Sequence, residues 1–307
     1  MYGLEEIRRG IRRPREALME VNAVYNRRKH GAYYNPDGVD IFEEDWDALA
    51  LLDSFRYDTF ADRSDLTGRL ETRTSRGGGT VEFLFGNFQN RELHDTVYVT
   101  ANPQFYRYRD ELDTEFHAVR NVWQDRWDDD LHTVNPEDMT DACLEAADEY
   151  PNKRLLFHYN QPHPPFIGPT GRELDMGTGP DERRGLVSEL LNDVFHEFTS
   201  REEFREAYEE NADLALEAAA ELLDNVEGRF VVTADHGEML GERAAPLPVR
   251  YYSHRIGVHV EELTKVPWHV RESDNRPEIE IEDGEAIDDS ASDDTVSERL
   301  RDLGYME

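Results

Sequence analysis

Short apolar runs along the chain predict its strands. Residues 46–52 (WDALALL) are apolar enough for a buried strand, and residues 95–100 (DTVYVT) alternate as a strand should before Ala-Asn-Pro ends them. Further strands are expected at 154–159 (RLLFHY), at 229–234 (RFVVTA) and near 264–270.

Helical spacing predicts the longer segments. A helix is expected to start after Asn135-Pro136, because proline favours the first helical position, and to run to Tyr150. Residues 183–198 and 201–225 are also expected to be helical. In the second of these, apolar side chains recur at helical spacing: Phe204, Tyr208, Ala215, Ala218 and Leu222. The last residues, SERLRDLGYM, are expected to form a closing helix.

Strands that alternate with helices predict an α/β protein. The expected architecture is a three-layer sandwich with a mostly parallel central sheet and helices on both faces. We expect an N-terminal helical extension over residues 1–45, a main domain over 46–271, and an acidic linker with a C-terminal helix over 272–307. An irregular loop is expected from the end of strand 229–234 to about residue 260.

Charge excludes several classes of function. The 307 residues include 34 Lys and Arg against 68 Asp and Glu, which gives a formal net charge of −34. A nucleic-acid-binding protein that works through clustered basic residues is therefore excluded, and adhesion to an anionic membrane is disfavoured. Only three lysines occur, Lys29, Lys153 and Lys265. An acidic surface nearly without lysine is typical of proteins that work in molar salt, because the salt screens the repulsion between the acidic side chains. We therefore expect a cytoplasmic protein of a high-salt cell.

Cysteine content and hydropathy exclude further kinds of site and of segment. Cys143 is the single cysteine, which excludes an internal disulfide and a cysteine-based zinc site. No apolar run approaches about 18 residues, and the N-terminal sequence has no apolar signal-peptide core. Neither a transmembrane segment nor a secretion signal is expected.

Carboxylates and a histidine follow two predicted strands, where open α/β sheets form their sites. Asp53 follows strand 46–52 and suits a hard metal ion, although capping of the next turn is the alternative. Asp235 and His236 follow strand 229–234, and aspartate oxygen with histidine nitrogen suits Mn²⁺, Zn²⁺ or Fe²⁺. Glu238 is a candidate outer-shell partner of these ligands.

A glycine-rich turn, Gly77-Gly78-Gly79, precedes Thr80 and an apolar segment. Thr80 is expected at a helix N-terminus, where free N–H groups and the helix dipole favour an anion. Its hydroxyl can act as a nucleophile where a metal lowers its pKa, whereas an ordinary N-cap threonine is the alternative. Ser75 is the competing hydroxyl in this turn.

Histidines supply the candidate acid–base groups. His163 lies between prolines that fix its backbone, so it can bind an oxyanion or protonate a leaving group. His158 lies within a strand and is expected to be a satisfied core histidine. His254 and His259 follow the metal motif, and one of them is expected to return to the site.

These motifs, taken in order, resemble the sulfatase-like branch of the alkaline phosphatase superfamily. VVTADHGEMLGE resembles its metal-binding loop, LLDSFRYD its first metal-binding strand end, and GGGTVEFLFGN its nucleophile turn. FHYNQPHPPF resembles its substrate-side segment, and HRIGVHVEELTKVPWHV resembles the stretch that returns a histidine. The resemblance spans residues 46–270 and the last dozen residues, and it implies an alkaline-phosphatase-like fold with 46–271 as the catalytic domain.

The resemblance also implies roles for residues. Asp53, Asp235 and His236 would be metal ligands, and Thr80 both ligand and nucleophile, with Mn, Zn or Mg as the divalent ion. His163 and His254 would be substrate-binding or acid–base residues. Sulfatases proper carry Cys or Ser in C/S-x-P-x-R, oxidised to formylglycine, whereas this turn reads Gly-Thr-Val-Glu-Phe. The set is more similar to phosphoethanolamine and glycerophosphate transferases and to threonine-dependent phosphodiesterases.

The function expected from this resemblance is a metal-dependent hydrolase or transferase. It would act on a phosphoester or a sulfate ester through a covalent Thr80 intermediate, with a small-molecule, glycan-linked or lipid-linked substrate. The alternative is a non-catalytic sulfatase-like protein with a binding or assembly role. Because a degenerate copy usually loses ligands and this chain keeps all four, the enzyme is favoured.

Overall fold

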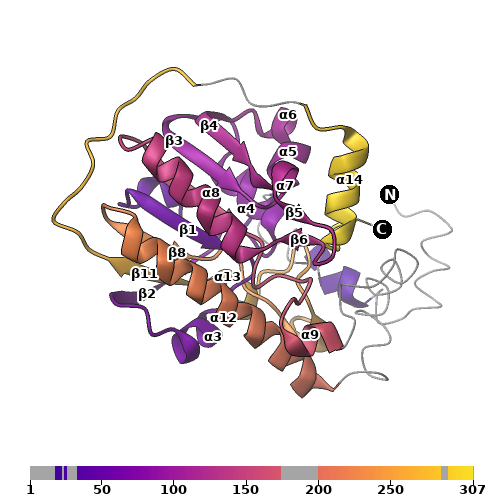
Figure 1. Cartoon of the computed structure of the whole chain (residues 1–307). Coiled ribbons are helices and arrows are strands. Elements are labelled where there is room, and N and C mark those ends of the chain that lie inside the picture. The colour runs from indigo at the N-terminus through magenta and orange to yellow at the C-terminus, as the bar shows by residue number, and fades with distance from the viewer. Residues whose placement is uncertain (1–17, 23, 26–32, 174–199, 285–289, 307) are drawn as a thin grey trace.

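The computed structural model describes residues 18–22, 24–25, 33–173, 200–284 and 290–306 (Figure 1). The helix expected at 183–198 and most of the N-terminal extension lie outside these residues.

A seven-stranded sheet forms the centre of the molecule, in the order β2-β11-β8-β1-β7-β3-β4. Its strands are β1 (Ala48–Leu52), β2 (Arg69–Thr74), β3 (Glu92–Thr100), β4 (Glu115–Asn121), β7 (Arg154–Tyr159), β8 (Phe230–Thr233) and β11 (Lys265–Arg271). The strands from β8 to β4 in this order pair in parallel, and β11 is antiparallel to both of its neighbours. The predicted, mostly parallel sheet is confirmed.

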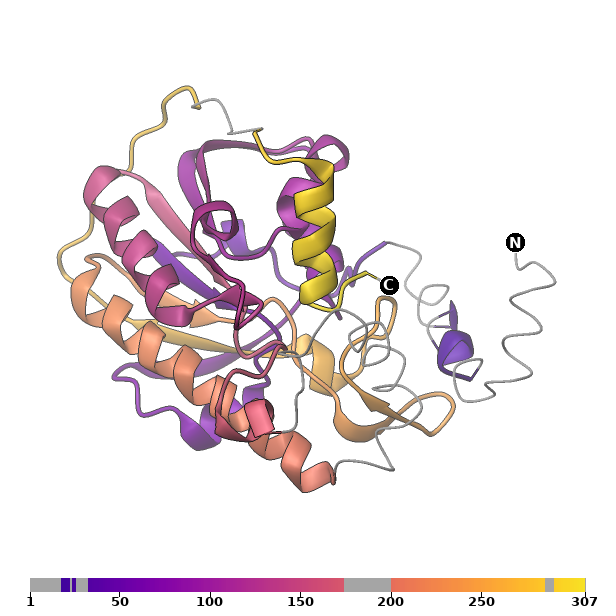
Figure 2. The same cartoon turned by 45° about the vertical axis from the view of Figure 1, so that its right-hand side comes forward.

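Alternate side chains of the central strands enter two separate cores. In β1, Ala48, Ala50 and Leu52 pack in one core with residues of α8 (Pro136–Glu149) and α12 (Arg201–Asn225). Leu49 and Leu51 pack in the other with residues of α4 (Thr80–Asn87), α5 (Gln104–Arg107) and α6 (Arg109–Leu112). Helices therefore cover both faces of the sheet, as the predicted three-layer sandwich requires (Figures 1 and 2).

The smaller elements connect these layers. The helical ones are η1 (Ile41–Glu43), α3 (Tyr57–Arg63), α7 (Val122–Asp125), α9 (Pro169–Glu173), α13 (Glu261–Thr264) and α14 (Asp293–Asp302). Two short strand pairs are β5 (Trp127–Asp128) with β6 (Thr133–Val134), and β9 (Leu240–Ala244) with β10 (Val249–Tyr252). Among the described residues, no helix combines the length and the apolar character needed to cross a bilayer.

One local prediction was wrong, and the predicted closing helix is confirmed with different bounds. The region expected to be an irregular loop contains the antiparallel hairpin β9–β10, which is held by an apolar cluster that includes Met239, Ala244 and Tyr251. The closing helix α14 begins at Asp293, because the side chain of Ser292 caps it by accepting from the N–H of Thr295.

The acidic segment that follows β11 lies along the main domain. Arg276 pairs with Asp45 and with Asp47, at 2.7 Å in each case. Lys153 Nζ lies 2.9 Å from Glu282 Oε2. The three-part division of the chain stays a prediction.

Candidate metal centre and nucleophile

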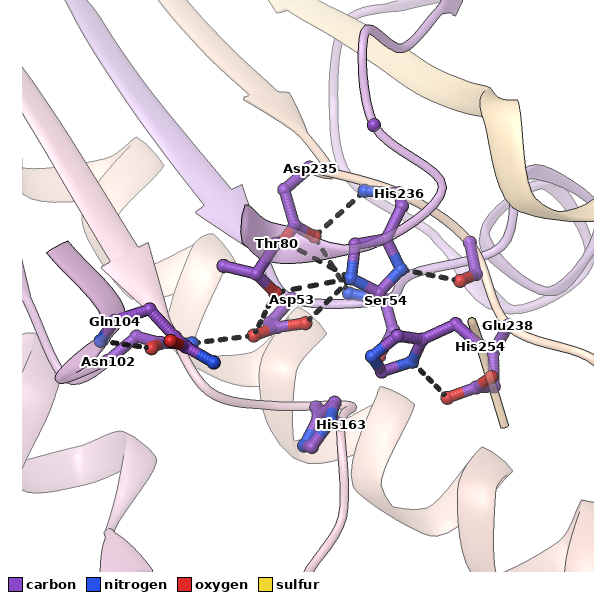
Figure 3. Close-up of polar contacts among 12 residues, drawn as sticks. Asp53, Ser54, Thr80, Asn102, Gln104, His163, Asp235, His236, Glu238 and His254 are labelled. Atoms are coloured by element: carbon purple, nitrogen blue, oxygen red, sulfur yellow. Dashed lines mark hydrogen bonds and ion pairs between the residues drawn. The ribbon is translucent and has the colours of Figure 1, made fainter. Parts of the chain in front are cut away.

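The side chains of the predicted metal set meet at the edge of the sheet where the parallel strands end (Figure 3). Asp53 directly follows β1, Asp235 and His236 follow β8, and Thr80 is the first residue of α4. One potential ligand atom from each of Asp53, Asp235 and His236 lies within 4.8 Å of the other two. The fold therefore brings together the four residues that the motifs singled out.

Two carboxylates share this fully buried position. Asp53 and Asp235 are each 0% exposed, and no lysine or arginine in the described part of the chain pairs with either. Burial, and then the Asp235 carboxylate, raise the pKa of Asp53 well above its usual range, and burial also raises the pKa of Asp235. Asp53 Oδ1 and Asp235 Oδ2 accept no hydrogen bond from the described residues. Two buried like charges need a compensating cation, so these side chains fit a divalent metal ion.

His236 presents an unprotonated nitrogen to the two carboxylates. Its Nδ1 lies 2.7 Å from the carbonyl oxygen of Gly237, and because a carbonyl only accepts, Nδ1 carries the proton. Its Nε2 lies 3.4 Å from Asp53 Oδ1 and 3.4 Å from Asp235 Oδ2. Burial holds the pKa of His236 well below its usual value, so the ring is neutral. A histidine fixed in this way, with its free nitrogen toward two carboxylates, has the geometry of a metal ligand.

Thr80 places a hydroxyl against the same cluster. Its Oγ1 lies 3.3 Å from Asp53 Oδ2 and 3.3 Å from His236 Nε2. A Cβ on Gly78 would lie 2.2 Å from the carbonyl oxygen of Val258, so a glycine is needed for the turn that leads to Thr80. Thr80 itself is buried and is the first residue of α4.

Ser75, the competing hydroxyl, has a different environment. Its Oγ donates to the carbonyl oxygen of Asp235 and accepts from the N–H of Gly77 at 3.0 Å. Both bonds are to the main chain, so Ser75 connects the glycine turn to the loop that carries Asp235 and His236. Of these two hydroxyls, that of Thr80 lies against Asp53 and His236.

Glu82, which the sequence analysis did not assign, binds the glycine turn to the loop that carries His259. Its carboxylate accepts from the N–H of Gly78 at 2.9 Å and from the N–H of Gly257 at 2.8 Å. Nε2 of His259 lies 3.1 Å from Glu82 Oε2. One of His254 and His259 was expected to return to the site, and His259 instead serves this connection. The sequence signal for Glu82 was a single acidic residue inside an otherwise apolar segment.

His254 and His163 lie beside the cluster. The ring centroid of His254 lies 4.3 Å from that of His236 and 5.2 Å from that of His163 (Figure 3). His254 Nδ1 lies 3.2 Å from Glu238 Oε2. Burial acts to lower the pKa of His254, but Glu238 and the neighbouring acids more than offset it and raise this pKa. His163 bonds through Nδ1 to the Pro164 carbonyl, and burial holds the pKa of His163 well below its usual value.

Two residues that the sequence analysis did not assign donate to Asp53. Asn102, which follows β3, donates to Asp53 Oδ2 at 2.9 Å. Tyr305, which follows α14, donates to the same oxygen at 2.8 Å. The signal for Asn102 was its position at a strand end, whereas Tyr305 lies 252 residues from Asp53 and had no local signal.

His158 differs from the satisfied core histidine that was expected. Its Nδ1 bonds to the hydroxyl of Tyr98 at 2.7 Å. Its Nε2 has no hydrogen-bond partner among the described residues and lies 4.0 Å from Asp235 Oδ2. Burial lowers the pKa of His158 to about 4, so the ring is neutral and only half of its hydrogen-bonding capacity is used.

Solved structures similar to this chain include two phosphoethanolamine transferases. The C-terminal periplasmic domain of phosphoethanolamine transferase EptC from Campylobacter jejuni is 13% identical, with a TM-score of 0.44 over 74% of this chain and 78% of that chain. The integral membrane lipooligosaccharide phosphoethanolamine transferase A from Neisseria meningitidis is 13% identical, with a TM-score of 0.45 over 72% of this chain and 47% of that chain. This chain thus matches about half the length of the membrane protein.

A third similar structure is a protein in complex with its substrate D-glucosamine-2-N,6-O-disulfate. It is 12% identical, with a TM-score of 0.45 over 85% of this chain and 76% of that chain. No protein-family model matches the sequence, and no curated protein matches it. Because one fold hosts many activities, function has to be derived from the side chains of the site.

Proposed function

We propose that this chain is a metal-dependent hydrolase or transferase of a phosphoester, with Thr80 as its nucleophile. The observation that carries the proposal is the position of Thr80 Oγ1, at the start of α4 and 3.3 Å from both Asp53 Oδ2 and His236 Nε2. Asp53, Asp235 and His236 would hold a divalent ion, which is Mn, Zn or Mg. When bound, such an ion supplies positive charge that lowers the pKa of a neighbouring hydroxyl and neutralises a phosphoryl group.

The residues of the site account for each part of the transfer. Thr80 Oγ1 attacks phosphorus in line, and the new oxygen–phosphorus bond forms as the bond to the leaving oxygen breaks. Asp53 Oδ2, at 3.3 Å, accepts the hydroxyl proton of Thr80. The free N–H groups at the start of α4 stabilise the negative phosphoryl oxygens. His254, held by Glu238, protonates the leaving oxygen, and water or an acceptor alcohol then takes the phosphoryl group from Thr80.

A phosphoester is favoured over a sulfate ester by the nucleophile itself. A formylglycine hydrate forms from cysteine or serine, and a threonine side chain cannot be oxidised to an aldehyde. Thr80 occupies the turn, whereas Cys143 is a buried residue of α8.

The test combines substitution with mass spectrometry. Full-length protein loaded with Mn²⁺, Zn²⁺ or Mg²⁺ is assayed on aryl phosphate, phosphodiester and aryl sulfate substrates. Thr80→Ala should lower phosphoester turnover by about 10³-fold or more, because the covalent nucleophile is lost, whereas Thr80→Ser should keep part of it. Ser75→Ala is the matched control and should have a mild effect. Quenched reactions should show a phosphoryl adduct on the peptide that contains Thr80; an adduct on Ser75, or full activity in Thr80→Ala, would contradict the mechanism.

A further inference from the structure

The end of α14 directs the side chain of Tyr305 toward the site. Gly304 has φ of +80°, in the left-handed region, and terminates the helix. The N–H of Tyr305 donates to the carbonyl of Leu300 at 2.8 Å, and the N–H of Gly304 donates to that of Arg301 at 3.0 Å. Leu300 is 0% exposed and Leu303 is 2% exposed, so the helix is anchored in the core within two residues of the tyrosine. The end of α14 therefore holds Tyr305 in place.

The side chain of Tyr305 contacts several members of the site. Its hydroxyl donates to Asp53 Oδ2 at 2.8 Å and lies 3.2 Å from Thr80 Oγ1. Its ring stacks on His163, with centroids 4.8 Å apart and an interplanar angle of 23°.

The two oxygens of the Asp53 carboxylate have different surroundings. Oδ2 accepts from the hydroxyl of Tyr305 and from Nδ2 of Asn102, and it lies 3.3 Å from Thr80 Oγ1. Oδ1 accepts from none of the described residues and lies 3.4 Å from His236 Nε2. Rotation of the carboxylate would break the bonds to both donors. The donors therefore fix the orientation of the carboxylate, with its other oxygen toward His236.

We propose that Tyr305 is a positioning residue of the metal centre. With Asn102, its hydroxyl holds the Asp53 carboxylate so that Oδ1 is presented toward Asp235 and His236. The inference rests on the proposed metal site and adds to it a residue from the far end of the chain. Loss of an outer-shell donor of this kind typically costs about 10- to 100-fold in metal affinity.

The experiment removes only the hydroxyl. Tyr305→Phe keeps the ring that stacks on His163 and deletes the donor to Asp53. Dissociation constants of the full-length protein for Mn²⁺ and Zn²⁺ are measured by competition with a chromogenic chelator, and the thermal unfolding of the metal-free protein is followed in parallel. We expect affinity to fall about 10-fold or more, with metal-free unfolding close to that of the control. The control is Tyr106→Phe, which loses a hydroxyl bonded to the Ala291 carbonyl at 3.2 Å and should bind metal as the parent does.

Asp235→Ala separates this inference from the proposed function. If the parent binds metal no more tightly than Asp235→Ala, the metal site is wrong and the role of Tyr305 falls with it. If Asp235→Ala loses the metal and Tyr305→Phe binds it as tightly as the parent, the metal site stands and the positioning role is overturned. A lower KM in Tyr305→Phe with unchanged metal affinity would also overturn it, because the tyrosine would then obstruct the substrate.

Discussion

Three histidines beside the candidate metal cluster, His163, His236 and His254, each direct Nδ1 to an oxygen acceptor. His236 and His163 bond to main-chain carbonyls, and His254 bonds to the carboxylate of Glu238. Each ring therefore leaves Nε2 available as a ligand or as an acid–base nitrogen. The sequence motifs predicted these histidines but not their bonds, because two of the acceptors are carbonyls of the following residue, whose direction depends on the fold.

His269 gives a pH prediction away from the metal cluster. It is 3% exposed on β11, its Nε2 lies 3.2 Å from the carbonyl oxygen of Leu66, and burial lowers its pKa from the ordinary 6.5. Between the lowered pKa and 6.5 the unfolded chain binds more protons at this residue than the folded chain does. The free energy of unfolding that it contributes is thus fully present above that window and is lost as pH falls through it.

His269→Gln removes this titration and is compared with the parent by urea unfolding at about pH 7.5 and about pH 5. The loss of unfolding free energy between the two pH values should be smaller in the variant. The other histidines are common to both proteins. Only the difference between parent and variant in how the free energy of unfolding changes with pH is therefore assigned to His269. Equal slopes would contradict the prediction, whatever the stability of the variant at either pH.

Elements were predicted accurately where one of their ends carries a clear local signal. Strand β7 ends at a proline-rich segment, and α12 begins at Ser200, which forms a capping box with Glu203. Strand β2 (RLETRT) was not predicted, because it is an edge strand with largely polar and partly exposed side chains. Its register depends on its pairing with β11, which is distant in the sequence.

The cap of α14 provides a prediction at the scale of an element. A Cβ at Gly304 would meet no atom within 4 Å, so Gly304→Ala adds no clash and only left-handed backbone strain. We expect the free energy of unfolding to fall by about 1 kcal/mol, and the metal affinity to fall with it, because Tyr305 is displaced. Gly304→Asn is the control, because asparagine tolerates the left-handed conformation. This variant should keep more of the unfolding free energy and of the metal affinity than Gly304→Ala does. Urea unfolding and metal titration measure the two effects, and full metal affinity in Gly304→Ala would show that the cap affects stability alone.

The topology of the whole molecule explains why distant motifs form one site. Strands β8, β1, β7 and β3 are neighbours in the sheet and run in parallel, so the segments that follow them converge at one edge. Asp235, Asp53, His163 and Asn102 all come from such segments. The sequence predicted this convergence for three of the four, but Tyr305 joins them through the packing of a helix, which no strand pattern encodes.

Net charge gives the prediction for the molecule as a whole. A formal charge of −34 on 307 residues opposes compaction wherever the acidic groups are unscreened. The screening length falls from about 10 Å at 0.1 M salt to about 3 Å at 1 M, so we expect the free energy of unfolding to rise steeply with KCl over this range. Urea unfolding followed by circular dichroism at both concentrations measures this free energy.

A variant with Glu278→Gln and Asp283→Asn, both in the exposed acidic segment, should be more stable than the parent at low salt and should gain less stability from KCl. Equal stability of the parent at low and molar KCl would show that the acidic excess is not an adaptation to salt.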